Sequence, residues 1–219
     1  MRPMRPISPI IKVCGMRDAD NIREVESLGI NMMGIIFWPK SSRYVCARPD
    51  YLPTKCKRVG VFVDEDIDTI CRITDEYGLD YIQLHGHESP DYCAKLQGIH
   101  LIKAISVNGC DDIATYKRYE GLVDYFLFDT KCPSVGGSGQ QFDWCVLSAY
   151  QGDTPFLLSG GIGPDDAQRL SALRVLDGFP VEKCIGIDLN SRFELAPGLK
   201  DVASLRRFLT QLTHSSYQN

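Results

Sequence analysis

The sequence predicts an α/β protein whose simplest architecture is a (β/α)8 (TIM) barrel. Short β-branched or apolar runs alternate with helical stretches from one end of the chain to the other. Several of these runs are apolar on both faces, as buried parallel strands are. Eight strand–helix units in 219 residues leave about 27 residues per unit, near the compact end of what such a barrel needs.

The individual elements follow from apolar runs and from helix start signals. An Asp or Ser precedes most of the helical stretches, and Pro90 stands at a favoured first helical position. The predicted strands are Ile10–Cys14, Met32–Phe37, Arg58–Val63, Tyr81–His85, Leu101–Val107, Val123–Asp129, Pro155–Ser159 and Lys183–Leu189. The predicted helices are Ala19–Leu28 after Asp18, Ile67–Tyr77 after Asp66, one after Ser89, three opened by Asp111, Asp143 and Asp165, and a last one over Lys200–Leu212.

The region between the second and third strands lacks room for a full helix. Twelve residues separate Tyr44 from Lys57, and they include Pro49 and Pro53. We therefore expect the second helix to be shortened or missing.

No low-complexity segment or linker divides the chain, so we expect residues 1–219 to form a single domain. The alternative architecture is a doubly wound open sheet. It is disfavoured because no G-x-G-x-x-G motif follows the first strand.

Composition and charge argue against several classes of protein. The chain is 44% hydrophobic and 24% charged, as globular proteins are. The longest nearly unbroken apolar run, Ile30–Trp38, is far shorter than the ~20 residues of a membrane-spanning helix. The N-terminal segment has no apolar stretch typical of a secretory signal. A net charge of −4 and a pI near 5.6 argue against nucleic acid as a partner.

The nine cysteines form no C-x-x-C pair and no zinc-type cluster with histidine. Their number is odd, and a chain of this length does not need disulfides for stability. We therefore expect reduced thiols in a cytoplasmic protein, most of them buried as small hydrophobic residues.

In a barrel of this kind, functional side chains collect where strands end and lead into the following loops. Cys14 ends the first strand, and strand alternation places it with Lys12 on the face opposite Ile11 and Val13. The apolar pair should face the helices, so Cys14 and Lys12 should face the barrel interior. A thiol there is either a packing residue or a general base. The second role requires a thiolate, and so a pKa below the usual value of about 8.5.

Asp129 ends the sixth strand and shares a strand face with Leu127. No helix follows at once, so a role as a helix cap is disfavoured. A carboxyl group that acts as an acid near neutral pH needs a raised pKa, from burial or from a second negative group.

Two small-residue loops follow the last two strands, where barrels frequently bind phosphate. They are Ser159–Gly161 and Asp188–Ser191. His85 and His87 are spaced H-x-H but have no carboxylate or cysteine partner at ligand spacing, so we expect no metal. His85 is expected at the rim of the barrel. Arg43 lies in the loop after the second strand, either as an ordinary loop residue or as a ligand-binding residue.

Taken together, the chain resembles the phosphoribosylanthranilate isomerase family of tryptophan synthesis. Nine segments match in the family's order and span nearly the whole chain. They are KVCGM (Lys12–Met16), GIIFWPKSSRYV (Gly34–Val45), VGVFVDE (Val59–Glu65), QLHGHE (Gln83–Glu88), IKAISV (Ile102–Val107), FDTK (Phe128–Lys131), GGSGQQFDW (Gly136–Trp144), LSGGIGPDDA (Leu158–Ala167) and PGLKD (Pro197–Asp201).

The resemblance implies an Amadori rearrangement of N-(5-phosphoribosyl)anthranilate by general acid–base catalysis. Asp129 would protonate the ring oxygen, and Cys14 would remove the proton from C2. Arg43 would pair with the anthranilate carboxylate.

The same resemblance also implies which residues bind the phosphate and what the protein binds. Gly160, Gly161, Asp188 and Ser191 would lie in the phosphate site, with Asn190 and His85 also contacting substrate. The resemblance implies no metal and no organic cofactor. We expect a small phosphorylated substrate as the partner, no nucleic acid, no membrane, and a monomer or homodimer.

Three departures from the family pattern stand out. Arg192 replaces a glycine beside the expected phosphate site, which would cost about 1 kcal/mol if φ is positive there. Its side chain would offset this cost by reaching the phosphate. Gln140 replaces a lysine in the glycine-rich loop, and the second strand–helix unit is short.

Three other functions remain open at this stage. The related histidine-pathway isomerase carries a carboxylate where Cys14 stands. Indole-glycerol-phosphate synthase needs a catalytic lysine at the end of the second or third strand, where Phe37 and Val63 stand. A non-catalytic phosphosugar-binding barrel would keep the phosphate site, but it would have no need for both Cys14 and Asp129.

Overall fold

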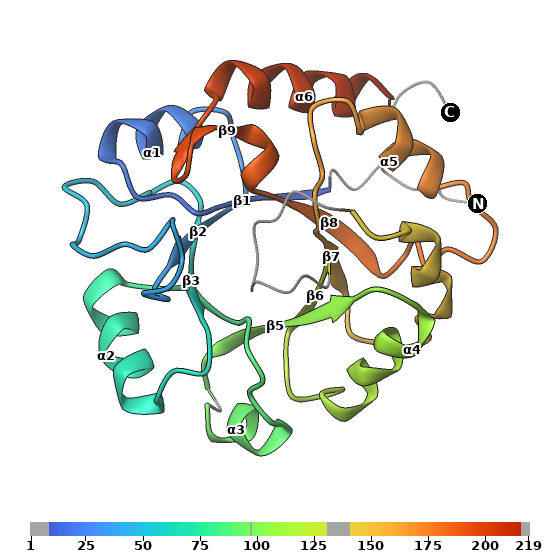
Figure 1. Cartoon of the computed structure of the whole chain (residues 1–219), viewed down its shortest axis with the longest axis horizontal. Coiled ribbons are helices and arrows are strands. Elements are labelled where there is room, and N and C mark those ends of the chain that lie inside the picture. The colour runs from blue at the N-terminus through green and yellow to red at the C-terminus, as the bar shows by residue number, and fades with distance from the viewer. Residues whose placement is uncertain (1–8, 97, 131–140, 216–219) are drawn as a thin grey trace.

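The computed structural model describes residues 9–96, 98–130 and 141–215. Eight strands form a closed parallel barrel in chain order, and the helices surround it (Figure 1). The predicted (β/α)8 architecture is therefore confirmed, and the open-sheet alternative is excluded. Gln140 and most of the GGSGQQFDW segment lie outside the described residues.

The predicted strands agree with the observed ones to within a residue or two at each end. The barrel strands are β1 (Ile10–Cys14), β2 (Met32–Ile36), β3 (Lys57–Phe62), β4 (Tyr81–Leu84), β5 (His100–Val107), β6 (Tyr125–Thr130), β7 (Phe156–Leu158) and β8 (Cys184–Leu189). The α-helices are α1 (Ala19–Glu26), α2 (Ile67–Tyr77), α3 (Pro90–Lys95), α4 (Cys110–Ile113), α5 (Ala167–Leu173) and α6 (Val202–Ser215). Short 3-10 helices are η1 (Ala114–Arg118), η2 (Trp144–Ala149) and η3 (Ser191–Phe193).

Side-chain caps explain why three of the helices begin where they do. Asp18, Asp66 and Ser89 each accept a hydrogen bond from a backbone N–H in the first turn of α1, α2 and α3. Gly78 ends α2 in the left-handed conformation at φ 58°. The start signals predicted for these helices are confirmed.

The last part of the chain differs from the prediction. A small antiparallel sheet, β9 (Glu194–Ala196) with β10 (Leu199–Lys200), follows β8. Lys200 therefore lies in a strand and not at the start of a helix. The carboxylate of Asp201 accepts the N–H of Ser204 at 3.0 Å, which sets the start of α6. Asp143 also opens a 3-10 helix and not an α-helix.

No helix connects β2 to β3, as predicted for this unit. The side chain of Glu26, at the end of α1, holds the later part of the connecting segment instead. Its carboxylate accepts the hydroxyl of Tyr51 and the backbone N–H groups of Thr54 and Lys55, each at 2.5 Å. Burial favours the protonated form, but these hydrogen bonds outweigh it and hold the pKa of Glu26 below its ordinary value.

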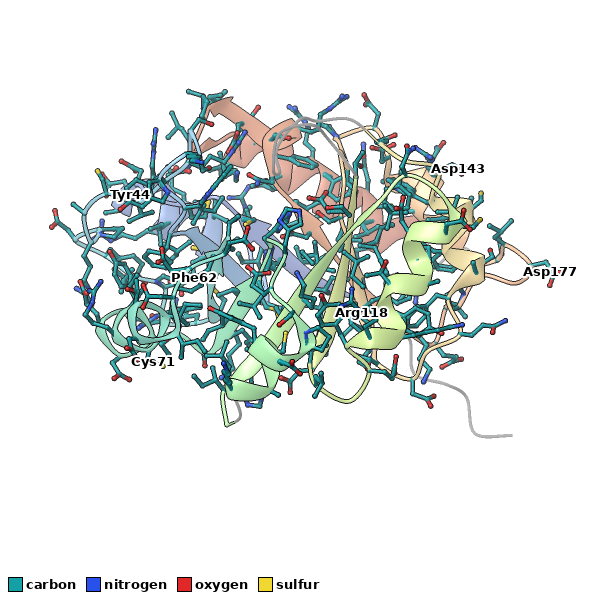
Figure 2. All side chains as sticks on the ribbon, turned by 60° about the horizontal axis from the view of Figure 1, so that its bottom comes forward. Tyr44, Phe62, Cys71, Arg118, Asp143 and Asp177 are labelled. Atoms are coloured by element: carbon teal, nitrogen blue, oxygen red, sulfur yellow. The ribbon has the colours of Figure 1, made fainter. Side chains whose placement is uncertain are left out.

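The apolar residues form two layers, one inside the barrel and one between the strands and helices. The inner layer contains Met32, Val59, Ile102, Ala104, Leu127 and Leu157. Phe62 belongs to the outer layer, and Figure 2 shows it within the molecule while Asp177 stands on a loop at the edge. Burying a side chain of this size contributes ~1.5–3 kcal/mol.

All cysteines among the described residues are free thiols, but most of them are not buried. Cys14 and Cys93 are buried, whereas Cys46, Cys110 and Cys145 are exposed. The prediction that most cysteines are core residues is therefore wrong, because several lie in loops and short helices that face solvent. Within the described ranges, no helix is both long and apolar enough to cross a membrane.

Candidate active site

Cys14 lies at the C-terminal end of β1 on the inner face of the barrel, and its side chain is 3% exposed. Its partner in the register of β2 is Gly34. A Cβ atom built on Gly34 would lie 2.6 Å from the Cys14 sulfur, closer than packed atoms approach. Gly34 therefore provides the space that the thiol occupies.

Lys12 shares this inner face and is fully buried. Its register partner in β8 is Asp188, and the Lys12 ammonium donates to the Asp188 carboxylate at 2.9 Å. The second Asp188 oxygen accepts the hydroxyl of Ser159 at 3.4 Å. The sequence predicts that Lys12 points inward, and β-strand register explains the identity of its partner.

The pKa of the Cys14 thiol is raised, not lowered. Burial disfavours the thiolate, the Lys12 ammonium lowers the pKa only in part, and the Asp188 carboxylate raises it further. Lys12 itself is disfavoured as a cation by burial, but Asp188 outweighs this and raises the pKa of Lys12. A general base needs a thiol with a lowered pKa, and this site does not provide one. The neutral thiol is the stable form near neutral pH.

Asp129 lies across the barrel on the inner face of β6, as alternation predicts, with Leu127 in the inner apolar layer. One Asp129 oxygen lies 3.2 Å from Nε2 of His85, and the other accepts the backbone N–H of Thr130 at 2.9 Å. The Asp129 side chain is 14% exposed, so it is accessible from the mouth of the barrel.

Gln83 orients His85, and sequence reasoning did not single it out. Its side-chain nitrogen lies 2.8 Å from Nδ1 of His85. With Gln83 as the donor, Nδ1 accepts and Nε2 carries the proton that faces Asp129. The signal was present, since residues two apart on a strand share a face.

Arg43 is mostly buried and bound to a carboxylate of this chain. Its Nε and Nη2 donate to the Glu194 carboxylate at distances from 2.7 to 3.0 Å. Glu194 also accepts from the Lys200 ammonium at 2.5 Å. Burial disfavours the charged forms of Glu194 and Lys200. It lowers the pKa of Lys200, whereas bonds from Arg43 and the Lys200 charge hold the pKa of Glu194 below its ordinary value.

The two loops predicted for phosphate lie side by side after β7 and β8. Gly160 and Gly161 have φ of 88° and 66°, a conformation that favours glycine. Asn190 and Ser191 follow β8, with the Asn190 side-chain oxygen accepting from Lys200 at 2.8 Å. The Asp188 carboxylate points to Lys12 within the barrel.

The φ of Arg192 is not positive. Among the described residues, Asp64 alone of the non-glycine residues has a positive φ. The backbone strain that a positive φ would have caused at Arg192 is therefore absent. A Cβ built on Gly163 would lie 3.3 Å from Nε and 3.5 Å from Nη2 of Arg192. The guanidinium thus lies over the loop after β7.

His87 is exposed, and its Nδ1 lies 3.3 Å from the Asp64 carboxylate. His85 points to Asp129 inside the barrel, so the two histidines do not face a common point. No group of three or more His, Cys, Asp or Glu side chains that could hold a metal occurs within the described residues.

Comparisons with known proteins agree on one family. The family model described as N-(5'phosphoribosyl)anthranilate (PRA) isomerase matches residues 11–211. A Phocaeicola vulgatus protein named N-(5'-phosphoribosyl)anthranilate isomerase is 51% identical over 205 residues, covering 93% of this chain and 97% of its own. The crystal structure of phosphoribosyl anthranilate isomerase from Thermus thermophilus has a TM-score of 0.78 and 27% identity, covering 93% of this chain and 98% of its own.

A further solved structure is similar over the same extent and carries a ligand. It is phosphoribosyl anthranilate isomerase in complex with reduced 1-(o-carboxyphenylamino)-1-deoxyribulose 5-phosphate. It has a TM-score of 0.75 and 26% identity, covering 94% of this chain and 100% of its own. With one family matched over nearly its full length, and a barrel that brings Cys14 and Asp129 to the same mouth, this chain belongs to the N-(5'-phosphoribosyl)anthranilate isomerase family.

Proposed function

We propose that this protein catalyses the Amadori rearrangement of N-(5-phosphoribosyl)anthranilate to 1-(2-carboxyphenylamino)-1-deoxyribulose 5-phosphate, the tryptophan-pathway step of its family. The observation that carries the proposal is the placement of Cys14 and Asp129. Both lie on the inner face of the barrel, at the C-terminal ends of β1 and β6. A base and an acid on different sides of one mouth suit a reaction that needs both.

The first step is ring opening, with Asp129 as the general acid. A proton passes from the Asp129 carboxyl to the ring oxygen and the C1–O bond breaks. The nitrogen lone pair then forms a C=N bond, giving a protonated Schiff base. His85 lies beside this group, with its Nε2 3.2 Å from an Asp129 oxygen.

The second step is enolisation, with Cys14 as the general base. The Cys14 thiolate takes the proton from C2, and the electrons move to the cationic nitrogen to give an enolamine. Tautomerisation of the enolamine gives the ketone. The position of Lys12 beside Cys14 supports this role, since its ammonium offsets part of the cost that burial places on the thiolate.

Two groups of residues bind the substrate in this proposal. Arg43 pairs with the anthranilate carboxylate, a task suited to a forked guanidinium. Gly160, Gly161, Asn190 and Ser191 contact the phosphate, with backbone N–H groups as the main donors. Arg192 adds a cation to this site, because its guanidinium already lies over the adjoining loop at Gly163.

Asp188, predicted for the phosphate site, has a different role in the proposal. Its carboxylate holds Lys12 beside Cys14. A carboxylate aimed at a phosphate would repel it, so the pairing with Lys12 is the arrangement compatible with anion binding nearby.

The deciding experiment is a fluorescence assay that follows the loss of phosphoribosylanthranilate. We expect turnover by the purified protein without added metal or organic cofactor. A folded protein that gives no turnover would refute the proposal and favour a non-catalytic phosphosugar-binding barrel. A cytoplasmic location and a monomeric or homodimeric state stay predictions from the sequence.

A further inference from the structure

The Glu194 carboxylate accepts hydrogen bonds from three different residues. Its side chain is 5% exposed, and it accepts from two side chains and one backbone group. Arg43 contributes Nε and Nη2, Lys200 its ammonium at 2.5 Å, and Gly198 its N–H at 3.1 Å. This carboxylate is therefore held in one orientation from several directions.

The way in which Glu194 binds Arg43 leaves part of the guanidinium unused. A guanidinium has two edges that can each bind a carboxylate through two N–H groups. Glu194 occupies the edge formed by Nε and Nη2. Within the described part of the chain, Nη1 of Arg43 has no hydrogen-bond partner. The edge formed by Nη1 and Nη2 is therefore available to a second carboxylate.

Lys200 fixes Glu194 from the other side. Its side chain is fully buried, and its ammonium also donates to Asn190 at 2.8 Å. Its backbone is held by the side-chain amide of Asn21 in α1, which accepts the Lys200 N–H at 2.8 Å and donates to the Lys200 carbonyl at 3.0 Å. Lys200 thus connects Glu194 to a helix of the barrel wall.

A further contact ties the loop before Arg43 to the β9–β10 hairpin. Arg17 donates to the carbonyl of Ser42 at 3.1 Å and to the carbonyl of Pro197 at 2.8 Å. The loop that carries Arg43 and the hairpin that carries Glu194 are therefore joined at two points. Arg43, Glu194 and Lys200 together carry one net positive charge, which matches one incoming anion.

We propose that Glu194 and Lys200 are positioning residues that aim the free edge of Arg43 at the substrate carboxylate. Glu194 holds one edge of the guanidinium, and Lys200 holds Glu194. The inference rests on the proposed role of Arg43, and it assigns the selection of an ortho-carboxylated aromatic amine to this group of three residues. Charge alone predicts the opposite effect of removing Glu194, since its loss would leave two unopposed cations to attract the carboxylate.

The test compares two stable ligands that differ by one carboxyl group. One is reduced 1-(o-carboxyphenylamino)-1-deoxyribulose 5-phosphate, and the other is the same molecule with hydrogen in place of the carboxyl group. Calorimetry gives the Kd of each for the wild type and for Glu194→Gln. We expect Glu194→Gln to raise the Kd of the carboxylated ligand at least tenfold and to change the Kd of the other ligand less than threefold. The reason is that a misdirected guanidinium loses its bidentate contact.

Glu88→Gln is the matched control. Glu88 is also a buried glutamate paired with a lysine, Lys103 at 3.0 Å, but it lies behind the barrel wall near α3. We expect this variant to keep the wild-type ratio of the two Kd values. If Glu194→Gln does not fold, Glu194→Asp replaces it, because the shorter side chain cannot reach Arg43 and Lys200 together and should give the same loss.

The possible results are distinct. Tighter or unchanged binding of the carboxylated ligand by Glu194→Gln would overturn the inference in favour of a charge effect. Equal weakening of both ligands would also overturn it, since that is what general damage to the site produces. A wild type that does not distinguish the ligands would refute the role of Arg43 itself, while turnover of phosphoribosylanthranilate would still stand as a separate result.

Discussion

The proposed base and the proposed acid, on two sides of the barrel mouth, have different kinds of neighbouring side chains. Around Cys14, at the ends of β1 and β8, buried charges are dense. Lys12 and Asp188 lie inside the barrel, and Lys200 lies in the adjoining β9–β10 hairpin. Around Asp129, at β6, the neighbours are an imidazole and an amide, from His85 and Gln83. In the proposed mechanism, charged groups lie beside the thiol that must be ionised, whereas the carboxyl group that must deliver a proton faces an imidazole nitrogen of His85.

Beside the proposed base, Cys14, burial and charge act against each other. Burial alone makes a thiol too weak an acid to form a thiolate, and the ammonium groups offset part of that penalty. The result is a thiol whose pKa stays raised. The base is therefore ionised in only a small fraction of molecules near neutral pH, and kcat/KM should rise as the pH increases.

Removing one of the two proposed proton-transfer groups at a time should lower the activity most. Cys14→Ala and Asp129→Asn should each lower kcat by about 10²–10⁴, because acid–base groups contribute on that order. Steady-state turnover of phosphoribosylanthranilate measures both. Activity within a few-fold of wild type in either folded variant would show that the assignment on that side is wrong.

The next prediction separates the electrostatic role of Lys12 from its structural one. Lys12→Met leaves the buried Asp188 unpaired, which should destabilise the fold by about 3–5 kcal/mol, measured by urea unfolding. It also removes a cation that lowers the pKa of Cys14. The rise of kcat/KM with pH should therefore move to higher pH.

Lys103→Met provides the control for that experiment. Lys103 is buried and paired with Glu88, but it points outward from β5 toward Tyr119 and not into the barrel. We expect a comparable loss of stability with an unchanged pH profile. If both variants moved the pH profile equally, the shift would reflect general loosening of the fold and not the charge of Lys12.

A smaller effect should follow from filling the space beside the thiol. In Gly34→Ala the added methyl would lie 2.6 Å from the Cys14 sulfur and push it from its place. We expect kcat to fall about tenfold, because small displacements of a reacting group are costly. Gly109→Ala, where nothing lies within 4 Å and φ is −153°, controls for the loss of a glycine. An active, well-folded Gly34→Ala would show that the position of the sulfur is less constrained than its packing indicates.

Substitution in the two loops proposed to bind phosphate, after β7 and β8, should change the activity least. Arg192 is exposed, so its contribution to phosphate binding is screened by salt. Arg192→Gly should raise KM a few-fold at low ionic strength and hardly at all at high salt. An unchanged KM at low salt would remove Arg192 from the phosphate site.

Much of the architecture could be predicted because its causes are local. Alternation along β1 and β6 places Cys14 and Asp129 on inner faces, and capping residues such as Asp66 mark where helices begin. Two prolines in a short segment predict the missing helix. The β9–β10 hairpin escaped prediction because its strands are very short and their pairing carries no apolar pattern.

The partners of the charged groups could not be predicted, because they depend on contacts between distant segments. Lys12 meets Asp188 only once the barrel closes and brings β1 beside β8. Arg43 meets Glu194 across 151 positions of sequence. The raised pKa of Cys14 likewise follows from the depth of the closed barrel, which no property of the isolated segment Lys12–Met16 specifies.

The carboxylate of Glu26 binds the segment that replaces a helix between β2 and β3, and this makes the β2–β3 connection sensitive to acid. Its depressed pKa means that its stabilisation is present above the unfolded pKa of about 4.3 and is lost as the pH falls through the folded value. Protonation would release Tyr51 together with the amides of Thr54 and Lys55. Acid strong enough to protonate Glu26 should therefore loosen this connection, next to the loop that carries Arg43.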